Sequence, residues 1–460
     1  MSPLSLIVAL LALSVFAYYF GRRRAFAMAG GRSRSLHSRP GYYGAYVALW
    51  CALPALGVFA LWLLAQPGVI ESIVVSALPE AVRGLGPDRM SLLLNDIRNV
   101  ADGTFPASAA APHVAEAAAR LNRLDATGKG ALAALALTLA LAGLVFARSR
   151  VAPALRARNQ VERTIDILLI ACSSIAILTT IGIVLSLVFE SIRFFGKIPF
   201  FDFVLGIEWS PQTALRDDQV GSTGVFGAIP LFAGTMLITL IAMLIAVPVG
   251  LLSAIYLSDY ADLRVRGAVK PVVEILAGIP TVVYGFFAAL TVAPLFRGLG
   301  ESVGLDVASE SALAAGTVMG IMIIPFISSL SDDVMNAVPQ SLRNGSLAMG
   351  ATKSETIRRV ILPAALPGIF AACLLAVSRA IGETMIVVMA AGLAANLTAN
   401  PFEAVTTVTV QIVTLLIGDQ EFDSAKTLAA FALGLVLFVI TLAMNVVALH
   451  VVRKYREQYD

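Results

Sequence analysis

The 460-residue chain is 58% hydrophobic and only 14% charged, with a formal net charge of +3. A soluble globular domain carries about a quarter charged residues, so this composition excludes an ordinary soluble enzyme or binding module. Long apolar runs separated by polar segments instead predict an all-α, polytopic membrane protein.

About nine apolar segments are long enough to cross a bilayer as helices. The predicted spans lie near Pro3–Phe20, Tyr43–Leu64, Ala131–Phe146, Ile165–Phe189, Phe226–Leu257, Val269–Leu295, Leu313–Leu330, Gly368–Leu393 and Thr427–Val452. In the first segment, arginines follow the apolar run instead of preceding it, which favours a retained span over a cleaved signal peptide.

The first part of the chain is predicted to precede a complete core. Residues 1–158 form an N-terminal extension with about three spans and an external segment, and residues 159–460 form a six-helix domain. The boundary is suggested by the arginine-rich stretch Arg148–Arg163. The external segment Gln66–Gly130 includes a predicted amphipathic helix around His113–Leu124, to which no chemistry is assigned.

Basic residues predict the orientation in the membrane. They gather in five segments: after the first span, at Arg148–Arg163, at Tyr260–Lys270, before the eighth span, and in the C-terminal tail. Cytoplasmic loops of membrane proteins carry an excess of Lys and Arg. With nine spans all five segments fall on one side, which places the N-terminus outside and the C-terminus in the cytoplasm.

The sixth predicted span is interrupted by Gly278 and Pro280, with Tyr284 close by. Spans broken by glycine or proline often border the substrate path of a transporter. A purely structural kink is the alternative for these three residues.

A polar, basic stretch beginning at Ser331 joins the seventh and eighth spans. It predicts a helix over Gln340–Met349 that ends at Gly350, where glycine tolerates a left-handed backbone. Thr352 and Glu355 have the spacing of a capping box that starts a second helix. Pro363 and Pro367 are expected to end that helix before the next span. An ordinary basic cytoplasmic connection is the alternative interpretation.

Two ionisable residues lie inside the eighth predicted span. Arg379 comes twelve residues after Pro367, which is roughly 18 Å along a helix and therefore near the bilayer centre. Glu383 is expected one helical turn further, on the same face. Both should face the bundle interior. They either form a structural ion pair, or Arg379 offers a guanidinium to an oxyanion in transit while Glu383 positions it.

No enzyme motif appears in the sequence. Gly345 to Thr352 has the glycine spacing of a phosphate loop, but Ala351 stands where the essential lysine belongs. Without that lysine, nucleotide phosphates lose their charged partner. ATP, if it is used, must be bound by another chain.

Four segments together resemble the phosphate-specific ABC importers, and most closely their PstC-type permease subunit. These are IYLSDYA (Ile255–Ala261), LAGIPTVVYG (Leu276–Gly285), GATKSETIRRVILPAALPGI (Gly350–Ile369) and SRAIGETM (Ser378–Met385). The third is similar to the coupling loop of ABC importer permeases, although Asn344-Gly345-Ser346 replaces the usual Glu-Ala-Ala.

The resemblance implies a six-helix type I ABC importer core in a bacterial inner membrane. It implies as partners a second, PstA-type permease, two ATPase subunits and a periplasmic phosphate-binding protein. Phosphate is then the substrate, ATP and magnesium bind the ATPase, and this chain holds no cofactor and no nucleic acid. The alternatives are a permease for another oxyanion or phosphonate, or an ATPase-independent channel or scaffold.

The resemblance also assigns residues to two roles. The expected ATPase-coupling residues are Asn344, Gly345, Ser346, Gly350, Ala351, Thr352, Glu355 and Pro363. The expected substrate-pathway residues are Arg379, Glu383, Gly278, Pro280 and Tyr284.

Overall fold

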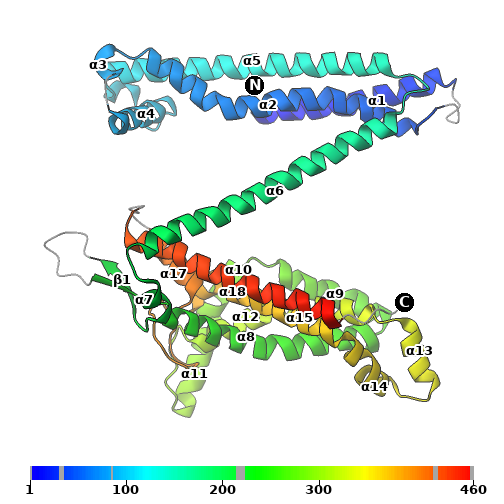
Figure 1. Cartoon of the computed structure of the whole chain (residues 1–460), viewed down its shortest axis with the longest axis vertical. Coiled ribbons are helices and arrows are strands. Elements are labelled where there is room, and N and C mark those ends of the chain that lie inside the picture. Colours follow the sequence, from blue (N-terminus) through cyan, green and yellow to red (C-terminus); the bar gives the residue numbers. More distant parts are fainter. Residues whose placement is uncertain (1–2, 31–35, 84–85, 214–222, 418–422, 456–460) are drawn as a thin grey trace. The chain divides into compact units, whose positions relative to one another are not determined.

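A computed structural model describes residues 3–30, 36–83, 86–213, 223–417 and 423–455. The described part is almost entirely helical, apart from one antiparallel hairpin of strands β1 (Trp209–Thr213) and β2 (Thr223–Phe226). The chain forms two compact units, Met1–Ile177 and Leu178–Asp460. Helix α6 contributes its first part to one unit and its second part to the other (Figure 1).

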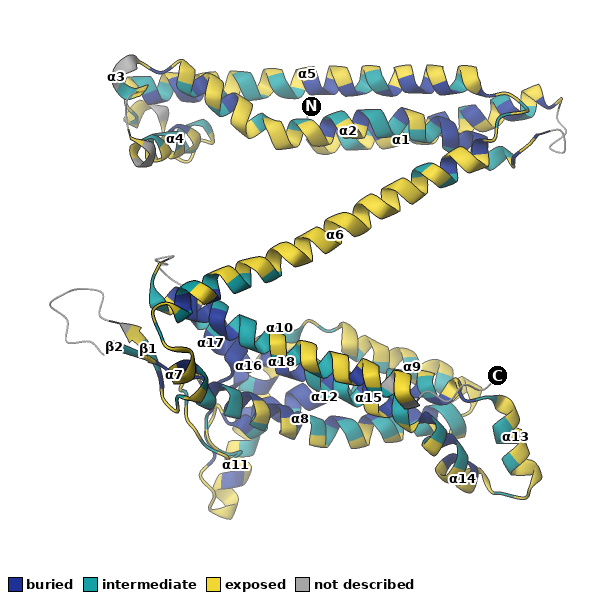
Figure 2. Cartoon of the chain, in the orientation of Figure 1, coloured by how far each residue is buried: buried dark blue, intermediate teal, exposed yellow. Residues whose placement is uncertain are grey.

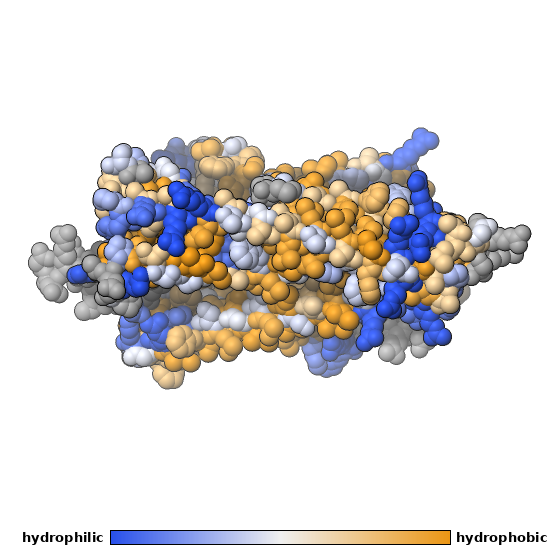
Figure 3. Space-filling model, turned by 90° about the horizontal axis from the view of Figure 1, so that it is seen from above, coloured by the Kyte–Doolittle hydropathy of each residue, from blue (hydrophilic) through white to orange (hydrophobic). Residues whose placement is uncertain are grey.

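Among the described residues, nine helical segments have the length and composition of membrane spans, as the sequence predicts. They are Pro3–Met28, Pro40–Ser76, Pro112–Arg150, Ala157–Phe195, Ile229–Tyr260, Thr281–Val303, Ala312–Asn336, Lys353–Ile381 and Ala425–Val451. On the face drawn in Figure 3, hydrophobic side chains cover the middle of the helices and hydrophilic ones gather toward their ends. The chain is therefore a multi-pass membrane protein.

In the first unit, α1 (Pro3–Met28), α2 (Pro40–Ser76) and α5 (Pro112–Arg150) pack against one another. Small residues permit the close approach, because a Cβ at Gly143 would lie 2.0 Å from the carbonyl oxygen of Trp50. The predicted helix around residues 113–124 is the first part of α5, so that helix and the third span are one element. The shorter elements are α3 (Glu80–Arg83), α4 (Pro87–Ala101) and a 3₁₀ turn at Ala107–Ala109.

In the second unit, α8 (Ile229–Ile255) and α12 (Ala312–Asn336) form the centre of the hydrophobic core. Helix α12 is the most enclosed span, and Figure 2 shows its buried residues among the surrounding helices. The other elements are α6 (Ala157–Phe195), α7 (Phe200–Leu205), α9 (Leu263–Gly278), α10 (Thr281–Phe287), α11 (Ala293–Val303), α13 (Gln340–Ala348), α14 (Lys353–Thr356), α15 (Leu362–Ile381), α16 (Met385–Ala390), α17 (Val408–Leu416) and α18 (Ala425–Tyr455). Single π-helical turns lie at Tyr256–Tyr260, Ala288–Val292 and Ile357–Ile361.

Several predicted span boundaries differ from the observed helix ends, and in two places the predicted span crosses a break between helices. The sixth span begins at Thr281 and not at Val269, because the backbone breaks between α9 and α10. The eighth span ends at Ile381 and not at Leu393, and the short helix α16 follows it. In both places an apolar sequence continues across the end of a helix, so hydropathy alone does not show the break.

The boundary between the predicted domains, after residue 158, lies near the start of α6. The two compact units instead divide inside that helix, between Ile177 and Leu178. Every residue from Ile165 to Ile183 in α6 is exposed (Figure 2). The functional boundary therefore stays a prediction.

Candidate functional site

The turn at Gly350 has the geometry that the sequence predicts. Helix α13 ends at Ala348, and Gly350 follows with a φ of +88°. L-residues adopt this left-handed conformation only at a cost, whereas glycine does not. The N–H of Gly350 donates to the carbonyl oxygen of Leu347 at 3.0 Å. This turn directs the chain from α13 into α14.

The capping box at the start of α14 is confirmed. The hydroxyl oxygen of Thr352 accepts the N–H of Glu355 at 3.3 Å. In return, the Glu355 carboxylate accepts the N–H of Thr352 at 2.9 Å. Each residue satisfies a backbone donor that the first helical turn leaves free, so α14 begins at a fixed position after the turn.

Two further predicted coupling residues fix the inside of this loop. The Ser346 hydroxyl lies 3.0 Å from the hydroxyl of Thr356, and the Ser346 carbonyl accepts the N–H of Ala351 at 3.2 Å. These bonds join α13 to the residues that follow the turn. The two helices and the turn therefore form one local structure.

Arg343 attaches the loop to the π turn Tyr256–Tyr260, which follows α8, and to the last part of α12. Its guanidinium donates to the carboxylate of Asp259 and, at 2.6 Å, to the carbonyl oxygen of Met335. The side chains of Arg343 and Asp259 are only 12% and 9% exposed. Removing one partner of such an enclosed pair leaves an uncompensated charge, so this pair holds the loop in place.

The outer face of the loop is exposed and partly apolar. The Leu347 side chain is 49% exposed and that of Met349 is 89% exposed. Asn344 and Gly345 are exposed on the same helix. These exposed side chains leave the outer face of the loop available for contact with another protein. The residues expected to contact an ATPase therefore fall into two groups. Ser346, Thr352 and Glu355 make bonds within the loop, whereas Asn344 and Gly345 are exposed on its outer face.

Pro363 and Pro367 do not end a helix, contrary to the prediction. The chain stays helical from α14 through a π turn at Ile357–Ile361 into α15. Pro363 lies in the first turn of α15, where the missing N–H costs little because the π turn has already shifted the hydrogen-bond register. Pro367 is accommodated inside α15, as membrane helices allow.

A cluster of charges connects α9 to α12. The Asp332 carboxylate accepts hydrogen bonds from Lys270 at 2.9 Å, from Arg266 at 3.2 Å and from the Asn336 amide at 2.9 Å. The Asp332 side chain is only 4% exposed. Its hydrogen bond raises the pKa of Lys270 above the ordinary value for lysine. The buried charge is thus matched by two cations from another helix.

The sequence analysis does not identify this cluster, because it assigns Ser331 and Asp332 to the start of a polar loop. The structure continues α12 to Asn336. Asp259 also lies in one of the recognised segments, yet it was given no partner. A single sequence contains no signal that pairs Asp259 with Arg343, or Asp332 with Lys270, across such separations.

Replacing Asp332 with asparagine should lower the melting temperature of the protein by several degrees. The change keeps the shape but removes the charge opposite Arg266 and Lys270, and hydrogen bonds to charged groups contribute about 1.5–3 kcal/mol. Thermal unfolding in detergent measures the effect. Asp333→Asn is the matched control, because Asp333 is the exposed neighbour. Equal melting temperatures for the two variants would contradict a stabilising role.

Arg379 lies at an exposed edge of α15, next to α12. Its guanidinium carbon is 5.7 Å from the ring centroid of Phe326, and Nη2 is 3.9 Å from the sulfur of Met322. The expected interior position is not found within this chain: the side chain is exposed, and no ion pair among the described residues includes it. Helix α15 buries its alanine face instead, at Ala372, Ala376 and Ala380.

An exposed arginine within a membrane span needs another environment than lipid. A charge facing hydrocarbon costs several kcal/mol. The aromatic ring of Phe326 offers a cation–π contact, but it does not neutralise the charge. The position of Arg379 therefore favours a face that borders either a second protein or a water-filled path.

Glu383 does not lie one helical turn beyond Arg379, because α15 ends at Ile381. A Glu383 carboxylate oxygen accepts the N–H of Met385 at 3.2 Å, and its carbonyl accepts the hydroxyl of Thr409 at 2.9 Å. Glu383 thus shapes the turn between α15 and α16. Of the two alternatives for these residues, the ion pair between Arg379 and Glu383 is not among the ion pairs that the structure describes.

The three weaker pathway candidates lie at the break between α9 and α10. Gly278 ends α9, and Pro280 precedes the first residue of α10. Both are exposed, whereas Tyr284 is buried. The Tyr284 hydroxyl donates to the carbonyl oxygen of Leu276 at 2.8 Å. This bond ties the two helices across the break, so the contacts of Tyr284 are structural in this chain.

Comparisons with known proteins show which family the chain resembles. A family model described as binding-protein-dependent transport system inner membrane component matches residues 246–457, and one described as phosphate ATP-binding cassette transporter matches residues 7–179. A chain of a solved bacterial ABC transporter involved in alginate import aligns with this chain at 18% identity and a TM-score of 0.44. The alignment covers 66% of this chain and 100% of the chain in that structure. That score is too low to carry an argument.

Curated relatives give a stronger result. The Bacillus subtilis protein named probable ABC transporter permease protein YqgH is 35% identical over 274 residues, which cover 59% of this chain and 84% of the relative. The Mycobacterium tuberculosis phosphate transport system permease protein PstC 1 is 35% identical over 277 residues, which cover 55% of this chain and 81% of the relative. The PstC protein of Haemophilus influenzae is 32% identical over 297 residues, which cover 60% of this chain and 88% of the relative. The chain therefore belongs to the family of ABC transporter permeases that includes the PstC permeases, and it is a transporter subunit, not an enzyme.

Proposed function

We propose that this chain is the PstC-type permease subunit of an ATP-driven phosphate importer in a bacterial inner membrane. It forms the translocation pathway with a second, PstA-type permease. Two ATPase subunits bind ATP and magnesium, and a periplasmic binding protein delivers phosphate. The names of the curated relatives support phosphate as the substrate.

The observation that carries this proposal is the ordered loop from α13 to α14. It presents Leu347 and Met349 on its outer face, while Gly350, the capping box and Arg343 fix its shape. A rigid, partly apolar projection fits a cleft of an ATPase and transmits a movement without deforming. An ATPase-independent channel or scaffold gives no reason for such a projection.

The exposed position of Arg379 supports the second part of the proposal. A second permease packed against α15 and α12 would shield the guanidinium from lipid and leave it facing a shared path. A guanidinium presents a planar set of donors that matches the oxygens of phosphate. Because α16 and the turn at Glu383 follow directly, they lie at the same part of the path.

Reconstituted transport tests this function. Vesicles that contain this chain, the second permease and the ATPase should accumulate labelled phosphate when ATP and the binding protein are supplied. Omitting the ATPase or ATP should stop accumulation. Stronger inhibition by excess sulfate or phosphonate than by unlabelled phosphate would assign the permease to another oxyanion, and uptake without any ATPase would contradict the proposal.

We also propose that residues 1–158 are an extension of a complete permease core and that the N-terminus is external. The extension holds three of the nine spans among the described residues, and six follow from Ala157. Parts of two basic segments, residues 31–35 and 456–460, lie outside the described residues. Arg22, Arg148 and Arg264 represent basic segments that this orientation places in the cytoplasm.

A cysteine at position 108 should react with a membrane-impermeant maleimide added from outside, whereas a cysteine at position 354 should react only after permeabilisation. Ser108 follows two spans and Ser354 lies in the coupling loop, and both are exposed. Cys51, Cys172 and Cys373 are first replaced. The reverse labelling pattern would show that the orientation is wrong.

A further inference from the structure

The basic segments of the first unit meet at one end of its helix bundle. The N–H of His37 donates to the carbonyl oxygen of Pro153 at 3.1 Å. The Tyr43 hydroxyl bonds the carbonyl oxygens of Pro153 and Leu155, each at 3.1 Å. The connection after α1 and the connection after α5 are therefore side by side. Arginines described at this end are Arg22, Arg23, Arg24, Arg39, Arg148, Arg150, Arg156, Arg158 and Arg163.

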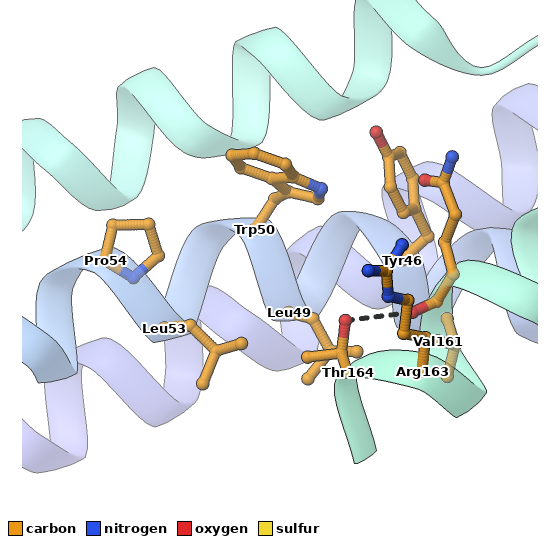
Figure 4. A pocket seen from close by; sticks show the side chains of 9 residues that line it. Tyr46, Leu49, Trp50, Leu53, Pro54, Val161, Arg163 and Thr164 are labelled. Atoms are coloured by element: carbon orange, nitrogen blue, oxygen red, sulfur yellow. Dashed lines mark hydrogen bonds between the residues drawn. The ribbon is translucent and has the colours of Figure 1, made fainter. Parts of the chain in front are cut away.

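A pocket of about 310 Å³ opens at this end, between α2 and the first turns of α6. Figure 4 shows its two kinds of lining. Tyr46, Trp50 and Leu53 come from α2, and Arg163 and Thr164 come from α6. Aromatic and apolar side chains of α2 thus line one side of the pocket, and α6 lines the other with a cation, two polar residues and the apolar Val161.

The positive charge at the pocket is not neutralised within the described part of the chain. Arg163 is exposed and takes part in none of the ion pairs that the structure describes. Its acidic neighbour Glu162 is occupied by Arg158 at 2.6 Å. Arg150 supplies a second cation nearby: its guanidinium lies 5.1 Å from the ring of Phe146.

Phe146 connects Arg150 to the pocket. The Phe146 ring lies 5.1 Å from that of Trp50, and Trp50 lies 6.4 Å from Tyr46. Tyrosine and tryptophan are enriched at the level of lipid headgroups. The pocket and its two cations therefore have the composition of the membrane–water interface.

The pocket extends from this interface toward the hydrocarbon. Its lining along α2 continues from Tyr46 through Leu49 and Leu53 to Pro54, which is roughly 12 Å along the helix at 1.5 Å per residue. The cationic residues lie at the end near the connections. A ligand that fits both parts has an anionic head and an apolar chain.

We propose that this pocket binds an anionic phospholipid. Arg163 and Arg150 attract the headgroup phosphate, and one acyl chain lies along Leu49, Leu53 and Pro54. The Thr164 hydroxyl lines the pocket but donates its proton to the carbonyl oxygen of Gln160 at 2.9 Å. Inorganic phosphate shares the charge of the head, but it leaves the apolar lining empty. Basic residues at a cytoplasmic membrane surface each add attraction for anionic lipid.

The test uses the full-length chain in nanodiscs, with Trp50 as the only tryptophan after Trp62→Phe and Trp209→Phe. Brominated phosphatidylglycerol, present at a low mole fraction in phosphatidylcholine, should quench Trp50 more strongly than brominated phosphatidylcholine at the same fraction. Arg163→Gln together with Arg150→Gln should weaken the apparent association with the anionic lipid at least about fivefold. Arg163→Lys should retain part of it.

Arg156→Gln is the matched control, because it removes the same charge just before α6, outside the pocket lining, and leaves the Arg158–Glu162 pair intact. It should leave the preference intact. Equal quenching by the two brominated lipids, or unchanged preference in the double variant, would overturn the proposal. Inorganic phosphate at millimolar concentration should not displace the lipid; displacement would show that the pocket recognises the free ion. The quenching experiment does not depend on transport activity, so its outcome is separate from that of the proposed function.

Discussion

Replacing Gly350 with proline is expected to reduce ATP-driven uptake about tenfold or more, with normal insertion of the chain into the membrane. Gly350 has a φ of +88°, whereas proline fixes φ near −65°. Proline also lacks the N–H that bonds the carbonyl oxygen of Leu347. The turn must then change direction, and α14 leaves its place relative to α13. Uptake and ATPase co-purification, at matched membrane levels, measure the result.

Two controls separate the backbone effect from the effect of a side chain. No atom lies within 4 Å of a Cβ built at Gly350 or at Gly345, so neither site lacks space. Gly350→Asn should retain most uptake, because asparagine tolerates the left-handed region. Gly345→Ala should fold normally, since alanine favours helix. Full uptake by Gly350→Pro would show that this loop does not transmit energy to transport.

Local signals correctly predicted the geometry of the turn between α13 and α14. The end of α13, the turn at Gly350 and the capping box at Thr352 each depend on residues within one or two helical turns. Such features follow from backbone geometry and from the hydrogen bonds of a helix end, which neighbouring residues determine. The sequence contains all the information that they require.

Predictions of where a helix continues and where it ends were less accurate. Pro363 was expected to stop a helix, but a preceding π turn accommodates it. The Arg379–Glu383 pairing assumed that α15 continues past Ile381, where it ends. Packing against other elements decides these outcomes. The Thr409 hydroxyl that bonds the Glu383 carbonyl, for instance, comes from α17.

Long-range pairs were beyond the reach of a single sequence. Asp332 meets Lys270, and Arg343 meets Asp259, only after the helices have packed. The pocket at Trp50 likewise needs α2 and α6 to be adjacent. Clusters of arginine predict which segments are cytoplasmic, but they do not show which arginines have acidic partners and which remain available to bind an anion.

Replacing Arg379 with alanine should reduce phosphate uptake at least about tenfold, because a charge-assisted hydrogen bond contributes about 1.5–3 kcal/mol. Arg379→Lys keeps the charge but loses the planar fork, so it should retain only part of the uptake. Arg379 is exposed and pairs with no described carboxylate, so both variants should assemble with the partner permease and the ATPase. Uptake over a range of phosphate concentrations, at matched protein levels, gives the measurement.

The double variant Arg379→Ala with Glu383→Ala decides between a pathway role and a structural pair. If the two residues formed a structural pair in the assembled transporter, removing both charges would restore uptake lost in the single variant. The structure leads us to expect no rescue, because the Glu383 carboxylate bonds the N–H of Met385 and not the guanidinium of Arg379. Near-normal uptake by the double variant would reject the pathway role of Arg379.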